Sequence, residues 1–405
     1  MKRLMKSPKR NQNVIEFRKP ILLYSLLAIL LVNCENYLAS QWTYTVPENI
    51  GDGFDVGTLE EVNMDSTLIA QAVSRIVRGK HKEVHSMLIF KDDKLVLEEY
   101  FQGHVYKWDA RNYHGDLVQW NRDMLHSNMS CTKSFTSACI GIAIERGFIE
   151  DVNQSIFDYL PDHQHFKTNN REYITIEHLL TMSSGLAWDE WSASHGTSAN
   201  DIDRLYFECE DPVSCVLEKP WWSVPGTRFT YNGGGMVILA EILRNATGMN
   251  IDEFSMEYLF EPLGIDNTDW TQYENGMYDA AGSLKINPRA MLKFGITYLN
   301  KGTWYGEHII SSDWVEKSSL AYNNNQGLRI PGEDSGINGY AYSWWISELS
   351  HLGDVIKMYR AGGWGGQEIM VFPELNMVVV FTGGNYASKT TLFELIQAYI
   401  LPAVQ

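Results

Sequence analysis

The sequence has too few basic residues for a protein that binds nucleic acid. It holds 33 lysines and arginines against 50 aspartates and glutamates, a formal net charge of −17. A body this acidic repels phosphate backbones, so we exclude nucleic acid as a partner. The 44 % of hydrophobic and 20 % of charged residues are typical of a globular chain that can form a large core.

Several common functional motifs are also missing. The chain contains no G-x-S-x-G, no Walker A loop and no G-x-G-x-x-G after a strand, which excludes an α/β-hydrolase elbow and the usual nucleotide loops. His81 and His85 have helical spacing without the glutamate of a zincin. We interpret this pair, and the pair His163 and His165, as solvated surface histidines. We therefore expect no metal site and no cofactor.

The longest apolar run at the N-terminus is too short to span a membrane. Residues 21–32 form a run of about a dozen, against roughly 20 for a spanning helix. The run follows a basic segment, as in an export signal, and Cys34 comes directly after it. A lipid anchor on Cys34, simple cleavage and a retained signal anchor remain alternatives. We predict an export or lipoprotein signal over 1–34 and location in the periplasm or cell envelope, with membrane attachment through this segment where it is retained or lipidated.

Cysteine is scarce, with five residues in the chain. Cys209 and Cys215 lie six apart in a loop-like stretch and could form a disulfide in an oxidising compartment. Two free, buried thiols are an equally weighted alternative. Cys131 and Cys139 lie on a predicted helix, where we expect them to be small core side chains.

The order of predicted elements indicates one domain over 35–405. Strand patterns occur near both ends, at 86–90, 95–101, 358–361, 368–372 and 377–382. Helical patterns occupy the middle and the C-terminus, at 130–146, 175–182, 235–244, 288–299 and 391–400. We predict a mixed α/β (α+β) fold: an antiparallel sheet built from about 41–129 and 320–405, flanked by helices, with an inserted all-helical region at about 130–319. A cleft between the two layers is the expected ligand site.

One tetrapeptide has the spacing of a serine nucleophile and its base. Ser130 and Lys133 form the only S-x-x-K and open a predicted helix, which places them one turn apart on one face. The helix N-terminus directs N–H groups and a positive dipole at the serine. A buried lysine there would have a lowered pKa and could accept the serine proton. A capping serine beside a surface lysine is the simpler alternative.

Two later segments could complete such a site. Tyr231 precedes three glycines before a helix and could present its phenol to the serine, as tyrosinate or by sharing a proton with Lys133. On a late strand, the glycines of Arg360-Ala361-Gly362-Gly363 would let a carbonyl approach. One N–H there and the Ser130 N–H would form an oxyanion hole. Arg360 is a cation suited to a substrate carboxylate.

With these segments in this order, the chain resembles the serine β-lactamase and penicillin-binding superfamily. It looks most like the class C β-lactamase-related serine hydrolases, a group that includes esterases and hydrolases of short nylon oligomers. The resemblance extends over about residues 85–400. Its main stretches are HSNMSCTKSFTS, ITIEHLLTMSSGLAWDE, FTYNGGGMVILAEIL and RAGGWGGQEIMVFPELNMVVVFTGG.

The resemblance implies an acyl-enzyme mechanism. Ser130 would be the nucleophile and Lys133 its base, and Tyr231 would share proton transfer with the leaving group. The N–H groups of Ser130 and of the strand near Gly363 would hold the oxyanion.

The chain departs from the penicillin-recognising pattern at two places. Asn232 stands one position early after Tyr231, and Arg360-Ala361-Gly362 replaces the usual Lys-Thr-Gly or His-x-Gly. We expect Asn232, Arg360 and Trp364 to contact substrate. Because the departures affect groups that contact a β-lactam, we favour an ester, a linear amide or a cell-wall peptide as the small-molecule substrate.

The sequence leaves other functions open. A D-Ala peptidase or a β-lactamase is the alternative within the enzymes. A catalytically silent binding protein of the same fold is the alternative outside them. Trp188, Trp191, Trp345 and Trp364 suggest an apolar cleft, with core packing as the other explanation.

Overall fold

The computed structural model describes residues 42–322 and 325–405. The predicted signal at 1–34 and the lipid anchor at Cys34 lie outside these residues. Tyr44–Gln405 forms one compact unit, which the following paragraphs describe. Within the described ranges, none of the helices combines the length and apolar character needed to cross a membrane.

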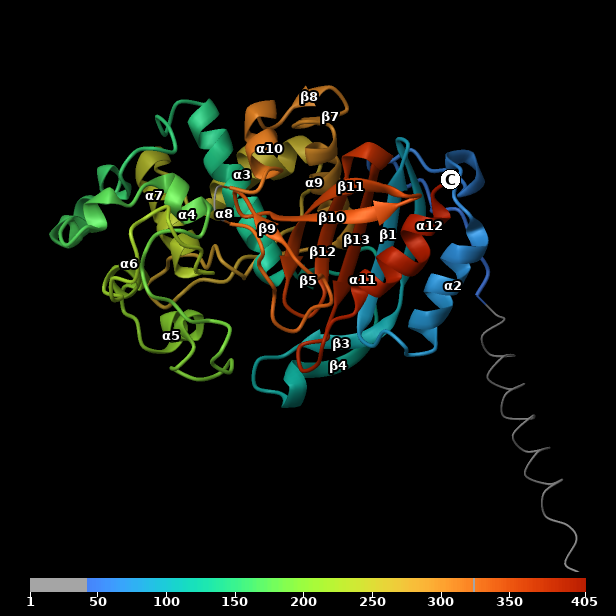
Figure 1. Cartoon of the computed structure of the whole chain (residues 1–405), viewed down its shortest axis with the longest axis horizontal. Helices are drawn as coiled ribbons and strands as arrows, with labels where there is room; N and C mark the ends of the chain where they lie inside the picture. Colours follow the sequence, from blue (N-terminus) through green and yellow to red (C-terminus); the bar gives the residue numbers. More distant parts are fainter. Residues whose placement is uncertain (1–41, 323–324) are drawn as a thin grey trace, which may run out of the picture. The chain divides into compact units, whose positions relative to one another are not determined.

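A seven-stranded antiparallel sheet is the centre of this unit, with strand order β2-β1-β13-β12-β11-β10-β9 (Figure 1). The strands are β1 (Val84–Lys91), β2 (Lys94–Tyr100), β9 (Gly339–Tyr340), β10 (Trp345–His351), β11 (Asp354–Gly363), β12 (Gln367–Phe372) and β13 (Met377–Gly383). The central strand β13 is rich in valine and buried on both faces, as β-branched residues favour. Strands from both chain ends therefore pair, which confirms the predicted sheet.

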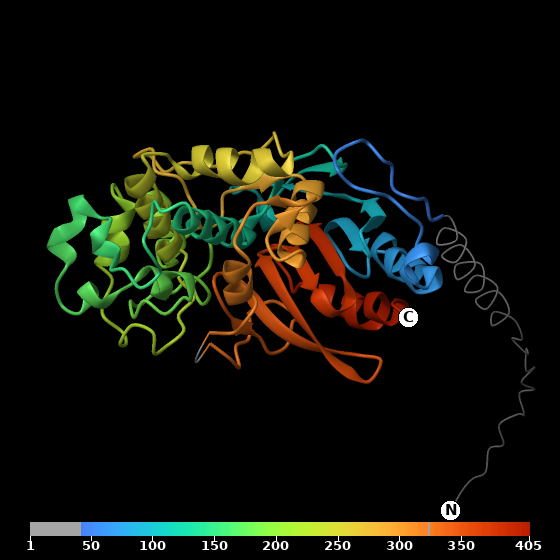
Figure 2. The ribbon, with the colours of Figure 1, turned by 90° about the horizontal axis from the view of Figure 1, so that it is seen from above.

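Helices cover both faces of the sheet. On one face, a Cβ at Gly295 of α9 (Pro288–Leu299) would lie 2.7 Å from the Ile369 side chain, so α9 packs closely on β12. Arg360 neighbours Ala361, the pairing partner of Ile369, and so points to the opposite face. There its guanidinium lies 5.0 Å from the ring centroid of Phe393 in α11 (Leu392–Leu395). Figure 2 shows the C-terminal helical segments beside α2 (Ser66–Val77) on this side.

The inserted region is helical, as predicted. Its helices are α3 (Thr132–Glu145), α4 (Ile176–Leu180), α5 (Asp201–Phe207), α6 (Pro212–Leu217), α7 (Gly234–Thr247) and α8 (Ile251–Ser255). Polar residues cap two of the helices: Thr175 precedes α4 in a capping box, and the Asn287 side chain accepts a hydrogen bond from the Ala290 N–H at the start of α9. Gly147 follows α3 with φ +76°, the left-handed conformation that ends helices.

Several elements have no counterpart in the sequence prediction. They are the hairpin of β3 (Gln102–Tyr106) and β4 (His114–Gln119), strand β10 and the short helices α5, α6, α8 and α10 (Ser312–Ser318). The β3–β4 hairpin is mostly half-buried, so its sequence shows no clean alternation of apolar and polar residues. Its position depends on tertiary packing, which a pattern within one strand cannot show.

The structure settles the open questions about cysteine and histidine. Cys209 and Cys215 are joined in a disulfide with 6.2 Å between their Cα atoms. Cys131 and Cys139 are buried free thiols, as expected. The interpretation of His81 and His85 as solvated is wrong, because both side chains are buried. His163 is also buried, where its ring bonds to an aspartate, whereas His165 is exposed.

Candidate active site

The nucleophile candidate Ser130 lies in a strained turn at the start of α3. A short 3-10 helix, Met129–Cys131, leads into α3. Met129 has φ +47°, a left-handed conformation that is costly for a side chain of this size. Ser130 itself remains partly exposed. The strained turn thus keeps the serine hydroxyl accessible at a helix N-terminus.

Lys133 lies one turn further along α3 and faces the serine. Its Nζ is 2.9 Å from Ser130 Oγ and donates a hydrogen bond to the Ala281 carbonyl oxygen at 2.9 Å. The side chain is buried, and this burial lowers the pKa of Lys133. The negative charges of Glu190 and Asp279 raise the pKa, but their effect is smaller than that of burial. Lys133 therefore loses its proton at a lower pH than a solvated lysine, as a base for Ser130 requires.

Polar side chains hold α3 in register with the segment that accepts the Lys133 hydrogen bond. Thr136 Oγ1 donates to the Ala280 carbonyl at 2.8 Å, and Thr132 Oγ1 accepts from the Leu284 N–H at 3.2 Å. Asp279 Oδ1 accepts from the Ala281 N–H at 2.8 Å. Because these groups are buried, their hydrogen bonds fix the position of the lysine's acceptor.

Tyr231 completes the cluster and lies partly buried just before α7. Its ring centroid lies 4.9 Å from Lys133 Nζ, and Tyr231 lines the same pocket as Ser130 and Lys133. Burial, reinforced by the negative charge of Glu190, raises the pKa of Tyr231 well above its usual value of 10. The tyrosine is thus a neutral phenol at neutral pH. This geometry favours proton sharing with Lys133 over the tyrosinate alternative.

Glu190 is a buried site residue that the sequence analysis missed. Its Oε2 accepts hydrogen bonds from Trp188 Nε1 at 2.6 Å and from the Gly233 N–H at 2.8 Å. A Cβ at Gly233 would lie 2.9 Å from the same oxygen, so this approach requires glycine. Burial raises the pKa of Glu190, and its charge acts on Lys133 and Tyr231. No motif in the sequence singles out this glutamate, because its partners come from a different segment.

Gly362 and Gly363 at the end of β11 let the strand lie against the Met129–Cys131 turn that carries Ser130. A Cβ at Gly363 would lie 2.5 Å from the Asn128 carbonyl oxygen and 3.2 Å from the Cys131 backbone nitrogen. Only glycine permits this contact. Gly363 therefore lies beside the turn that carries Ser130, where an oxyanion hole from the two backbones would have to form.

The prediction that Arg360 binds a substrate carboxylate is wrong in this structure. Its guanidinium is fully buried and lies 2.7 Å from both Glu368 carboxylate oxygens and 2.6 Å from Glu333 Oε2. A Cβ at Gly362 would lie 2.3 Å from Arg360 Nη1, so the glycine makes room for this ion pair. The charge of Arg360 is satisfied within the protein, and its side chain does not reach the pocket described below.

Asn232 is also outside the pocket. The side chain is buried, and its Oδ1 accepts a hydrogen bond from the Gly235 N–H at 3.1 Å at the start of α7. Its own N–H points to the Met182 sulfur at 3.2 Å. Since the residue follows Tyr231 directly, its side chain turns into the core. The prediction that Asn232 contacts substrate is therefore wrong.

A pocket of about 980 Å³ opens at Ser130, Lys133 and Tyr231. Aromatic side chains form much of its wall: Tyr106, Trp108, Tyr113, Trp120, Trp191, Tyr206, Phe207, Trp345, Trp364 and Tyr386. Of the four tryptophans considered in the sequence, three line the pocket, and Trp188 packs in the core. Trp364 lines the pocket, where its contact with substrate stays a prediction, whereas the tyrosines of β3 and of the turn before β4 were not predicted.

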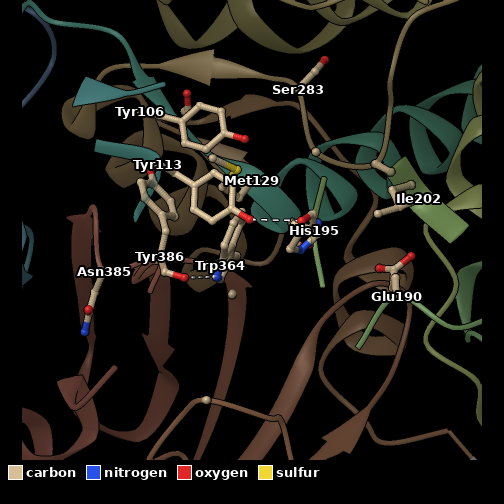
Figure 3. Close-up of a pocket in the computed structure, with 18 of the residues that line it drawn as sticks. Tyr106, Tyr113, Met129, Glu190, His195, Ile202, Ser283, Trp364, Asn385 and Tyr386 are labelled. Atoms are coloured by element: carbon tan, nitrogen blue, oxygen red, sulfur yellow. Dashed lines mark hydrogen bonds between the residues drawn. The ribbon is translucent and has the colours of Figure 1, made fainter. Parts of the chain in front are cut away.

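One side of the pocket is an aromatic wall made of Tyr106, Tyr113, Trp364 and Tyr386 (Figure 3). Tyr113 and Tyr386 meet Trp364 edge to face, with ring centroids 4.9 Å and 5.0 Å from that of Trp364. Tyr106 and Tyr113 lie nearly parallel, with centroids 6.2 Å apart. Trp364 Nε1 donates to the Tyr386 carbonyl at 3.1 Å. The imidazole of His195 stacks on Trp364, and the Tyr113 hydroxyl donates to the His195 carbonyl at 3.3 Å.

Among the described residues, one group brings three candidate metal ligands within 4.8 Å of one another: Glu83, His104 and His114. The two imidazoles stack with centroids 4.4 Å apart and planes 3° apart. The lone pairs of parallel rings lie in parallel planes and cannot converge on one ion. Glu83 also already accepts hydrogen bonds from His85 and His104. We assign this group to hydrogen bonding between the hairpin and the sheet.

A serine in a turn that opens a helix, with a lysine and a tyrosine beside it and a sheet strand across it, is the arrangement expected from the resemblance to the serine β-lactamase and penicillin-binding superfamily. The sequence model of the family described as Beta-lactamase matches residues 69–391, and the chain belongs to this family.

Individual relatives are distant. "Protein flp" of Staphylococcus aureus strain N315 is 24 % identical over 301 residues, which cover 70 % of this chain and 57 % of that protein. The chain thus spans less than two thirds of this curated relative's length.

Two solved structures share the fold. A Bacillus anthracis protein provisionally named a 6-aminohexanoate-dimer hydrolase has a TM-score of 0.60 at 22 % identity, covering 78 % of each chain. A family VIII carboxylesterase has a TM-score of 0.61 at 16 % identity, covering 82 % of this chain and 96 % of its own.

Proposed function

We propose that this protein is a serine hydrolase that cleaves an ester or amide through an acyl-enzyme on Ser130. The observation that carries the proposal is the 2.9 Å contact between Ser130 Oγ and the buried Lys133 amine, with the ring centroid of Tyr231 4.9 Å from the same amine. The named activities of the two structural neighbours support ester or amide substrates.

In the proposed acylation, Ser130 Oγ attacks the substrate carbonyl carbon as its proton passes to the Lys133 amine. The resulting oxyanion would accept hydrogen bonds from the N–H groups of Ser130 and Gly363. When the tetrahedral intermediate collapses, the bond to the leaving group breaks, and that group takes a proton through Tyr231 and Lys133. Water then attacks the acyl-enzyme, releasing the acid and restoring the serine hydroxyl.

The alternatives have less support from the site. A β-lactamase or D-Ala peptidase acts on substrates with a carboxylate, and the buried Arg360 offers no cation for one. A silent binding protein would not need the serine, lysine and tyrosine in mutual contact.

We also propose that the protein is exported through its N-terminal segment. The mass of the mature chain would reveal cleavage or a lipid on Cys34, and an uncleaved, unlipidated chain from the cytoplasm would reject export.

Covalent labelling tests the proposed nucleophile. The full chain is treated with a fluorophosphonate and, separately, with a penicillin, and intact mass and peptide mapping locate each adduct. We expect the fluorophosphonate on Ser130, no lasting penicillin adduct, and no labelling of Ser130→Ala at unchanged circular dichroism. A stable penicillin adduct on Ser130 would favour a cell-wall peptidase. No fluorophosphonate adduct on folded protein would reject the hydrolase.

A further inference from the structure

The charged groups that line the pocket are mostly acidic. Four carboxylates face it, those of Glu190, Asp203, Asp279 and Glu333, against two lysines. Asp203 bonds to His195 Nδ1 at 3.2 Å and the Gly196 N–H at 2.7 Å.

Neither pocket lysine is a free cation. Lys133 is held by Ser130 and Ala281, and its pKa is lowered by burial. Lys285 forms an ion pair of 2.6 Å with Asp269. Over the described residues, the pocket wall thus offers no unpaired positive group to a substrate carboxylate.

Glu333 stands between the pocket and the nearest arginine. It lines the pocket and pairs with Arg360, whose guanidinium is buried behind it and also binds Glu368. Burial raises the pKa of Glu368. Whether Glu368 is ionised or neutral, the three side chains together carry a net charge of −1 or zero. A substrate at this place in the pocket therefore meets the carboxylate of Glu333, and the positive charge of Arg360 behind it is already neutralised.

The aromatic wall also disfavours a substrate that carries a carboxylate. Burial raises the pKa values of Tyr106 and Tyr386 above 10, so both phenols stay neutral at neutral pH. Aromatic faces attract apolar groups and cations and do not stabilise an anion. A carboxylate that enters this half-open pocket loses part of its hydration and finds no unpaired cation to compensate for the loss.

We propose that the pocket accepts uncharged and cationic esters or amides and discriminates against substrates with a carboxylate near the scissile bond, with Glu333 as the specificity-determining residue. This inference rests on the proposed hydrolase function. It narrows that function to a substrate class opposite in charge to β-lactams and to peptides that end in D-alanine.

Matched esters test the charge preference on each side of the scissile bond. The acyl-side pair is p-nitrophenyl pentanoate against mono-p-nitrophenyl glutarate. The leaving-group pair is 3-carbamoylphenyl butanoate against 3-carboxyphenyl butanoate. After subtraction of spontaneous hydrolysis, we expect kcat/KM of each anionic ester to be about tenfold or more below its neutral partner, since charges a few ångströms apart interact strongly away from water. The 3-(trimethylammonio)phenyl ester should react at least as fast as the carbamoyl ester.

The outcomes separate the two levels of the proposal. Equal or faster hydrolysis of either anionic ester would overturn the charge preference. A trimethylammonio ester slower than the carboxylate would overturn it as well. No Ser130-dependent hydrolysis of any ester would instead reject the hydrolase function. Added salt should narrow the gap between charged and neutral esters by screening.

A substitution identifies the residue responsible. Glu333→Gln keeps an oxygen for Arg360 and removes one negative charge, so the anionic-to-neutral ratio of kcat/KM should rise severalfold. Glu348→Gln, on an exposed position of β10, is the control and should leave the ratio unchanged. An unchanged ratio in folded Glu333→Gln would remove Glu333 as the determinant. Where that variant does not fold, the salt dependence of the wild-type enzyme decides. A ratio of kcat/KM for the anionic ester to kcat/KM for the neutral ester that does not change with salt would overturn the proposal.

Discussion

The pocket has two regions with different construction. Its floor, formed by Ser130, Lys133 and Tyr231, consists of polar groups: the Lys133 amine hydrogen-bonds to Ser130 Oγ, and the pKa values of Lys133 and Tyr231 are shifted in opposite directions. Its aromatic wall consists of neutral rings from three chain segments. The rings that meet edge to face have centroids 4.9–6.5 Å apart. The floor needs one fixed geometry, because proton transfer depends on tenths of an ångström. The wall needs only shape and polarity, so it can determine what binds without changing the chemistry.

The largest effect should follow from damage to the floor. Lys133→Met keeps the side-chain length and removes the amine, so we expect kcat/KM for a neutral ester to fall by about 10²–10⁴. In the wild type, kcat/KM should rise with pH as Lys133 loses its proton, with a midpoint below the 10.5 of an ordinary lysine.

Stopped-assay rates from pH 5 to 10 with p-nitrophenyl butanoate measure both quantities. Lys357→Met, at an exposed position of β11, is the matched control and should retain wild-type rates. Near-normal turnover of Lys133→Met would place the base elsewhere and would end the distinction between floor and wall.

A smaller effect should come from the residue that adjusts the floor electrostatically. The Glu190 carboxylate raises the pKa of Lys133 against the larger effect of burial. Glu190→Gln removes that charge and retains an oxygen for the Gly233 N–H. The rising limb of kcat/KM should therefore move to lower pH.

The pH profile, rather than the rate at one pH, distinguishes this role from simple destabilisation. Glu348→Gln serves again as the control and should leave the midpoint in place. A midpoint that stays unchanged or moves upward in Glu190→Gln would contradict the electrostatic role.

The smallest effect should come from the wall. Trp364→Leu removes a ring that stacks on His195 and contacts Tyr113 and Tyr386. We expect KM for esters with aromatic leaving groups to rise by about two- to tenfold, the value of one aromatic contact, with kcat less affected. Trp222→Leu, an exposed tryptophan outside the pocket, is the control. A loss in kcat equal to that of Lys133→Met would mean that the wall takes part in the chemistry.

The pair Ser130 and Lys133 and most strands of the sheet could be predicted from the sequence because their signals are local, whereas Tyr231 was joined to the pair through the family resemblance and strand β10 was not predicted. Ser130 and Lys133 share one helical turn, and the strands of the sheet show continuous apolar runs. Glu190 and Arg360 show the limit of such reasoning. The environment of each is set by residues distant in sequence, Gly233 for Glu190 and Glu333 for Arg360. A cation beside glycines resembles a ligand group until the carboxylates that neutralise it are located in space.

The strand order of the sheet also bears on when the protein can become active. Strand β1 pairs with β13, so its neighbour is synthesised almost 300 residues later. Contacts this distant in sequence form slowly, and the strand that carries Gly363 is likewise among the last to be made. The oxyanion side of the site would therefore be absent until nearly the whole chain is available. If the proposed hydrolase activity holds, the nascent chain would stay inactive until its last strands are made, which is compatible with the proposed export of the chain before it folds.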